Sequence, residues 1–258
     1  MSSNLSTASD PASPRHATLI VLCALSVLPL SLFLPSLPAI VRDLRTDYAL
    51  VALSLGGYAA VAASLECVTG PLSDRFGRRP IVLTSVAIFA LGSLGCAMAT
   101  DIRVFLGCRL MQAAITSVYP VSMAAIRDTG GGARAASRIG YAAMAAAFAP
   151  MLGPTLGGVL EQTVGWRASF WLLAAVGIAL FAWCARDLVE THIRRPSSFA
   201  QQLRAYPALL HARRFWAYAL CMAFSTGAFY AFLAGAPLAA KTLFGIAPAE
   251  IGFYMGTI

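Results

Sequence analysis

The stretch "GPLSDRFGRRP" at residues 70–80 places four charged residues, two glycines and two prolines between two long apolar runs. Glycine and proline favour an abrupt change of chain direction, so we expect two helices to meet there. The rest of the chain is far less polar, since 59% of its 258 residues are hydrophobic and only 12% are charged. A soluble domain of this length carries more charge, and the composition therefore indicates a membrane protein.

The apolar residues come in blocks of about twenty, which is the length that an α-helix needs to cross roughly 30 Å of hydrocarbon. We therefore predict an all-α polytopic membrane protein with seven complete spans and the start of an eighth. The predicted spans cover residues 17–40, 48–70, 81–100, 104–126, 139–160, 166–185 and 215–240, and the eighth begins near Ile251. Residues 1–16 are rich in serine, alanine and proline, which predicts a disordered tail.

Basic residues are unevenly divided between the two sides of the predicted membrane. Thirteen arginines fall in the N-terminal tail and in the loops on the same side, whereas the opposite loops hold five lysines and arginines. Because basic residues concentrate in short cytoplasmic loops, the N-terminus is predicted to lie in the cytoplasm. The net charge of +8 then follows from orientation in the lipid bilayer, and no nucleic-acid partner is needed to explain it.

A basic connection at residues 186–214 separates the six spans of residues 17–185 from residues 215–258. Its apolar positions suit a short amphipathic helix on the inner leaflet, and a solvated linker is an equally good interpretation. Six helices, a long linker and further helices are the layout of a transporter built from two six-helix bundles. We therefore predict an N-terminal bundle and the start of a C-terminal bundle, whose remainder is either missing from this sequence or supplied by another chain.

Side chains suited to catalysis or metal binding are not arranged for either task. The six cysteines all fall inside predicted spans, and no two are spaced as C-x-x-C. The three histidines lie in cytoplasmic segments without neighbouring acids or thiols. The sequence therefore predicts no enzyme, no metal site and no cofactor.

The charged stretch at residues 70–80 fits a known pattern at each fixed position. It resembles the signature loop of the major facilitator superfamily, a Gly-x-Leu-Ser/Ala-Asp-Arg-x-Gly-Arg-Arg/Lys pattern. The matching residues are Gly70, Asp74, Arg75, Gly77, Arg78 and Arg79. The resemblance implies a gating loop that latches one transport state against helices of the second bundle.

Two further stretches strengthen the resemblance. "RLMQAAITS" at residues 109–117 is similar to the Arg-x-x-Gln-Gly pattern of the same superfamily, with Ala113 in place of the glycine. "APMLGPTLGG" at residues 149–158 is similar to the Gly-Pro-x-x-Gly-Gly element of its drug/proton antiporters. The matching residues of that element are Gly153, Pro154, Gly157 and Gly158.

With "FLPSLPAI" at residues 33–40 and "GWRASFW" at residues 165–171, the whole chain resembles the bicyclomycin and chloramphenicol resistance (Bcr/CflA) subfamily. The resemblance implies a bacterial inner-membrane protein that exports small amphipathic drugs by alternating access, with the proton gradient as its energy source. It also implies that the glycine-proline element seals the boundary between the bundles. Gly153 and Gly157 by themselves predict only a face that another helix approaches closely.

Arg109 falls inside the fourth predicted span. Placing an arginine there costs about 2.5–3.5 kcal/mol on insertion scales, so its side chain is expected to face the bundle interior or a cavity. From its chemistry alone, Arg109 clamps backbone carbonyls. The resemblance instead implies a part in proton transfer or in the polarity of the cavity.

Glu66 is the only carboxylate inside a predicted span. It either faces the cavity as a titratable group or lies close enough to the inner interface to reach water. Its depth differs from that of Arg109 by roughly 15 Å, which predicts that the two do not pair. Relatives in the subfamily carry an acid in the first span where this chain has Ser31 and Leu32, so either Glu66 replaces that acid or the coupling differs.

Adaptable apolar and aromatic side chains with a few hydroxyls suit a cavity for amphipathic drugs. The candidates for its lining are Ser31, Phe33, Tyr58, Tyr119, Met123 and Met144. Each of them is alternatively a residue that packs one helix against another.

Two other functions stay open. A nutrient or metabolite carrier of the same superfamily would share the loop and the spans, although the Gly-Pro-x-x-Gly-Gly element favours export. A seven-helix receptor or light-driven protein fits poorly, because the N-terminus is predicted inside and the only lysine, Lys241, lies at the outer edge of the seventh span.

Overall fold

The computed structural model describes residues 16–129, 132–190, 206–245 and 250, and over these residues the regular structure is entirely helical. The predicted tail and the predicted eighth span lie outside the described residues, as does much of the basic connection. The elements are α1 (His16–Leu32), η1 (Leu34–Ser36), α2 (Leu37–Asp43), α3 (Tyr48–Phe76), α4 (Arg78–Met98), α5 (Ile102–Gln112), η2 (Ala113–Ser117), α6 (Val118–Thr129), α7 (Gly132–Thr163), α8 (Arg167–Asp187), α10 (Tyr206–His211) and α11 (Arg213–Phe244).

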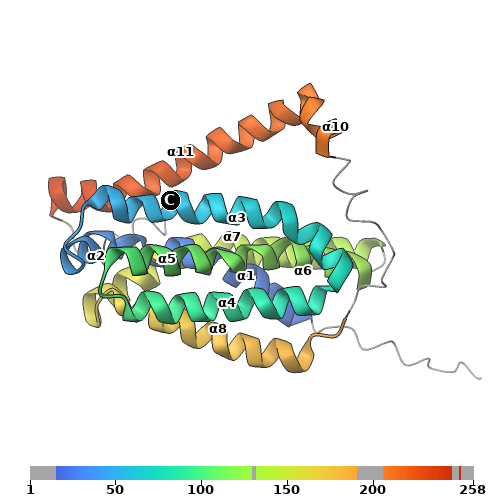
Figure 1. Ribbon diagram of the computed structural model, residues 1–258, viewed down its shortest axis with the longest axis horizontal. Coiled ribbons are helices and arrows are strands. Elements are labelled where there is room, and N and C mark those ends of the chain that lie inside the picture. The colour runs from blue at the N-terminus through green and yellow to red at the C-terminus, as the bar shows by residue number, and fades with distance from the viewer. Residues whose placement is uncertain (1–15, 130–131, 191–205, 246–249, 251–258) are drawn as a thin grey trace, which may run out of the picture.

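Six segments of the described chain are long and apolar enough to cross a membrane, and they correspond to the first six predicted spans. They run side by side along the long axis of the molecule, with the closest packing between α1 and α7 and between α4 and α8 (Figure 1). The expected seventh span, residues 215–240, lies within α11, a continuous helix of 32 residues. α11 crosses the bundle at an angle and contacts α2, η1 and α3 (Figure 1).

The first and fourth spans are not the continuous helices that the sequence predicts. The first is interrupted at η1, where Pro35 has no N–H to give to a helix and the amide of Ser36 donates to the carbonyl of Phe33 at 3.0 Å. The fourth is interrupted at η2, where the hydroxyl of Thr116 donates to the carbonyl of Ala113 at 2.9 Å. Such local hydrogen bonds compete with helix continuation and mark the point where the helix tightens.

The turn expected over residues 70–80 is much shorter in the structure. α3 continues to Phe76, so Gly70 and Pro71 lie inside a helix, and α4 begins at Arg78. Gly77 alone makes the change of direction, with a φ of 98° that favours glycine. The carboxylate of Glu190 also occupies the space where a side chain at Gly77 would lie.

An aromatic cluster joins the end of α1 to α5 and α8. Phe105 of α5 packs edge-on against Trp166 and Phe170, with ring centroids 5.8 and 5.5 Å apart. Phe170 of α8 in turn lies 6.2 Å from Phe33, at the end of α1. This cluster fixes the position of the first span's break relative to α5 and α8.

Candidate functional site

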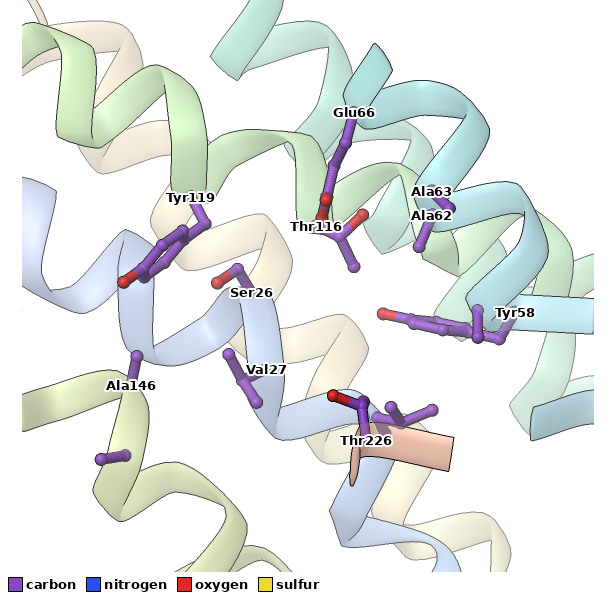
Figure 2. A pocket seen from close by; sticks show the side chains of 13 residues that line it. Ser26, Val27, Tyr58, Ala62, Ala63, Glu66, Thr116, Tyr119, Ala146 and Thr226 are labelled. Carbon is purple, nitrogen blue, oxygen red and sulfur yellow. The ribbon is translucent and has the colours of Figure 1, made fainter. Parts of the chain in front are cut away.

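A cavity of about 540 Å³ lies inside the bundle, and one of its walls comes from α11. Its lining residues belong to α1, α3, η2, α6, α7 and α11 (Figure 2). They are Ser26, Val27, Leu30, Tyr58, Ala59, Ala62, Ala63, Glu66, Thr116, Tyr119, Ala146, Ala147 and Thr226.

The lining combines small apolar walls with a few polar groups. Five alanines from α3 and α7 leave room inside the cavity, and five hydroxyl side chains are spread around it. Glu66 is the one charged residue of the lining, and its carboxyl end points toward the side where Thr116 lies (Figure 2). A concave apolar site with few polar groups is the usual form of a small-molecule site.

The structure brings only two of the six residues expected to line a cavity into this one, namely Tyr58 and Tyr119. Phe33 is fully buried and faces Arg109 instead, because the break after α1 turns it into the aromatic cluster. Ser31 is 4% exposed, and its hydroxyl donates to the carbonyl of Leu28. The remaining two also lie elsewhere, since Met123 is buried in the core and Met144 is 51% exposed on α7.

Arg109 is completely enclosed, with 0% of its surface exposed. Its guanidinium lies 3.9 Å from the ring centre of Phe33, 5.0 Å from that of Tyr58 and 5.9 Å from that of Phe170. Nη1 donates to the carbonyl of Pro29 at 3.3 Å, in the last turn of α1. A cation at a helix C-terminus and over aromatic faces is electrostatically favoured, and both effects offset the cost of burying it.

Gln112, one turn after Arg109, completes the polar contacts of the guanidinium. Its Oε1 accepts from Arg109 Nη1 at 2.7 Å, and its Nε2 donates to the hydroxyl of Ser93 on α4 at 2.7 Å. The hydroxyl of Ser93 in turn donates to the carbonyl of Phe89 at 2.8 Å. The network links α1, α5 and α4, and Ser93 is a member that carries no signal in the sequence.

No ion pair joins Arg109 to Glu66 in the described part of the chain, in line with their predicted difference in depth. Arg109 has no carboxylate within 4.0 Å among those residues. One charge therefore lies open to the cavity, while the other lies behind its wall. No group of three His, Cys, Asp or Glu side chains that could hold a metal ion occurs where the structure is described.

Residues 19–258 match the protein family described as the Major Facilitator Superfamily. The chain belongs to the Major Facilitator Superfamily. The chloramphenicol resistance protein of Pseudomonas aeruginosa is 33% identical over 216 residues, which cover 83% of this chain and 51% of that protein. The multidrug transporter MdfA of Yersinia pestis (strain Angola) is 30% identical over 207 residues, covering 79% and 51%. The chain thus spans about half the length of these curated relatives.

A solved structure has the same fold. The crystal structure of a bacterial homologue of the human lysosomal transporter Spinster, in an inward-facing and unoccupied conformation, aligns with a TM-score of 0.78. The alignment covers 93% of this chain and 58% of that one, at 18% identity. The chain is therefore a multi-pass membrane protein with the helix arrangement of a Major Facilitator transporter.

The Major Facilitator loop is anchored within the same bundle by partners outside its motif. The carboxylate of Glu190, just after α8, accepts from the backbone amides of Arg78 at 2.9 Å and Arg79 at 3.3 Å, and so caps the start of α4. Arg78 also forms a 2.6 Å ion pair with Asp128 at the end of α6. The sequence does not point to Asp128 or Glu190, because nothing in their local sequence distinguishes them from other loop acids.

The remaining loop residues are placed as follows. Arg79 Nη2 donates to the carbonyl of Ala185 at 2.8 Å, and the guanidinium of Arg75 lies 5.3 Å from the ring centre of Phe76. Asp74 is on the last turns of α3, and a side chain at Gly70 would meet nothing within 4 Å. A latch between this loop and the second bundle stays a prediction, since the observed contacts lie within the first six spans.

The Gly-Pro-x-x-Gly-Gly element of this Major Facilitator chain packs against α1. A side chain at Gly153 would lie 2.1 Å from the hydroxyl oxygen of Ser31, and one at Gly157 would overlap the carbonyl oxygen of Leu32. Pro154 and Gly158 are buried beside them. The close helix approach is made to α1 at its break, whereas the resemblance implied a partner in the second bundle. The role at the boundary between bundles stays a prediction.

Proposed function

We propose that the chain is part of a transporter that exports small amphipathic drugs in exchange for protons. The observation that carries the proposal is the cavity, which combines alanine walls, scattered hydroxyls and a single carboxylate. Its volume of about 540 Å³ suits a drug-sized compound. The printed names of two relatives, a chloramphenicol resistance protein and a multidrug transporter, support export of this class of compound.

Glu66 is the residue that we assign to proton coupling. It belongs to a membrane-spanning segment and lines the cavity, so a compound and a proton both have access to its carboxyl group. An intramembrane acid that faces a cavity is a functional site by default. It therefore stands in for the acid that relatives carry in the first span.

Arg109 takes a different part in this proposal. Its guanidinium is enclosed by rings and by hydrogen bonds, and it does not line the cavity. Its task is to hold α1 and α5 together. Alternating access then moves the bundles around the cavity.

The N-terminus and the loop of residues 70–80 lie on the cytoplasmic side in this proposal, since most arginines fall on that side. The membrane is the bacterial inner membrane, because the named relatives are bacterial. In this proposal, Asp74 and Arg75 meet the second bundle in one of the two transport states.

Transport in membrane vesicles tests the proposal. Everted vesicles from cells that produce the intact protein are loaded with a proton gradient, acid inside, and given labelled chloramphenicol or ethidium. We expect accumulation inside the vesicles that collapses with an uncoupler. Movement of the compound out of the vesicles would favour a metabolite carrier. Accumulation that does not depend on the proton gradient would contradict proton coupling.

A further inference from the structure

Three aromatic rings surround the Arg109 guanidinium, and only one of them also lines the cavity. Phe33 and Phe170 are fully buried in the aromatic cluster and are absent from the lining. Tyr58 is itself only 1% exposed, but it lies at the cavity wall: its ring is 5.0 Å from the guanidinium, and its hydroxyl end is on the cavity side (Figure 2). Tyr58 is thus the side chain that touches both the cavity and the buried cation.

The guanidinium also holds the opposite wall of the cavity. Arg109 Nη1 donates to the carbonyl of Pro29 at the end of α1. Ser26, one turn before Pro29, and Leu30, directly after it, line the same cavity as Tyr58 of α3. A compound between these walls therefore contacts both α1 and α3, and each of these helices contacts the Arg109 guanidinium.

The position of the Arg109 guanidinium is sensitive to movement of these side chains. Its Nε and Nη2 have no hydrogen-bond partner among the described residues, so the rings provide much of its stabilisation. A cation in an apolar interior responds strongly to the distance of its aromatic partners, because little solvent screens the interaction.

We propose that Tyr58 is the positioning residue through which a compound in the cavity acts on Arg109 and, by way of Pro29, on the last turn of α1. The compound shifts the Tyr58 ring, the guanidinium follows, and the hydrogen bond to Pro29 changes at the break of the first span. The inference rests on the proposed function, because it assumes that the cavity takes an amphipathic compound.

Hydrogen exchange of the intact, detergent-purified protein tests the inference without requiring transport. The probes are chloramphenicol and ethidium, each added at saturation, and the readout is the exchange of the amides at residues 30–34. We expect ligand to change that exchange at least threefold in the wild type and in Tyr58→Phe, which keeps the ring. In Tyr58→Leu, measured at a ligand concentration that saturates the variant, the change at residues 30–34 is lost.

Tyr119 supplies the matched control, since it lines the same cavity from α6. Tyr119→Leu is expected to weaken binding and to keep the ligand-dependent change in α1. A response in Tyr58→Leu equal to that of the wild type would overturn the inference, as would loss of the response in Tyr58→Phe.

The two proposals fail in different ways. If neither probe binds the wild type, both the proposed function and this inference are lost. If the probes bind but the exchange in α1 does not respond to them, only the inference is lost. In vesicles, Tyr58→Leu should lower the maximal transport rate about tenfold, a larger effect than its change in KM, whereas Tyr119→Leu should mainly raise KM.

Discussion

Glu66 and Arg109 both lie in membrane-spanning segments, yet their surroundings are opposite. Glu66 lies on the wall of an open cavity among alanines and hydroxyls. Arg109 has 0% exposure and is held by three rings, a glutamine and a backbone carbonyl. The difference teaches that a charge inside a span is not a single kind of signal. An open carboxylate can exchange protons and contact a compound, whereas an enclosed guanidinium organises the helices around it.

The largest effect is expected at the α1–α7 crossing, on which the enclosed site depends. In Gly157→Ala the new methyl group would overlap the carbonyl oxygen of Leu32, so α7 must move away from the break in α1. Overpacking of this kind costs about 1–3 kcal/mol or more, and backbone gives way less readily than a side chain. Thermal unfolding in detergent should show a markedly lower midpoint, or no folded protein.

Gly140→Ala is the matched control on the same helix, because a methyl group there would meet nothing within 4 Å. It should unfold at or slightly above the wild-type temperature, since alanine favours a helix over glycine. Equal decreases in the unfolding midpoint of Gly157→Ala and Gly140→Ala would contradict the close contact between α1 and α7.

Arg109→Ala is the second test, and it addresses the enclosed charge directly. The substitution leaves a large cavity among the rings and removes the donor to Gln112 and Pro29. We expect a loss of about 3 kcal/mol in the free energy of unfolding. A variant with wild-type stability would show that Arg109 does not organise this part of the bundle.

Glu66→Gln, unlike Arg109→Ala, should change transport and leave stability nearly unchanged, because Glu66 is exposed to the cavity and lies outside the packed core. The unfolding free energy should stay within about 0.5 kcal/mol of the wild type. Proton-driven transport should fall about tenfold and lose its dependence on pH, whereas Glu66→Asp should keep that dependence. Retention of the wild-type pH profile in Glu66→Gln would remove Glu66 from the coupling.

Ser93→Ala should give the smallest effect. It leaves Gln112 Nε2 without its acceptor but keeps the bond between Gln112 and Arg109. A single buried hydrogen bond contributes about 1 kcal/mol, so a small drop in thermal stability is expected, with transport preserved. A loss as large as that of Arg109→Ala would mean that the network acts as one unit.

The sequence predicted the features that depend on local composition. Long apolar blocks were enough to place six spans, and the charged stretch at residues 70–80 marked the junction of α3 and α4. The residue pattern also indicated the family, which the match over residues 19–258 confirms. These signals are local, so they need no knowledge of how the helices pack.

What the sequence missed depends on contacts between distant residues. Glu190 caps the start of α4 across 112 positions, and Ser93 joins the Arg109 network across 19 positions to Gln112. The breaks at η1 and η2 likewise follow from hydrogen bonds and packing that no periodicity shows. Phe33 was expected in the cavity and lies against Arg109, because the break in the first span redirects it.

The most direct test of the account is proton release from the purified, intact protein when a compound binds. A pH-sensitive dye in weak buffer would follow the addition of chloramphenicol or ethidium to the wild type and to Glu66→Gln. We predict that the wild type releases protons on binding, and that Glu66→Gln binds the compound but releases none. Equal proton release by the two proteins would contradict the assignment of the open carboxylate as the working charge of the cavity.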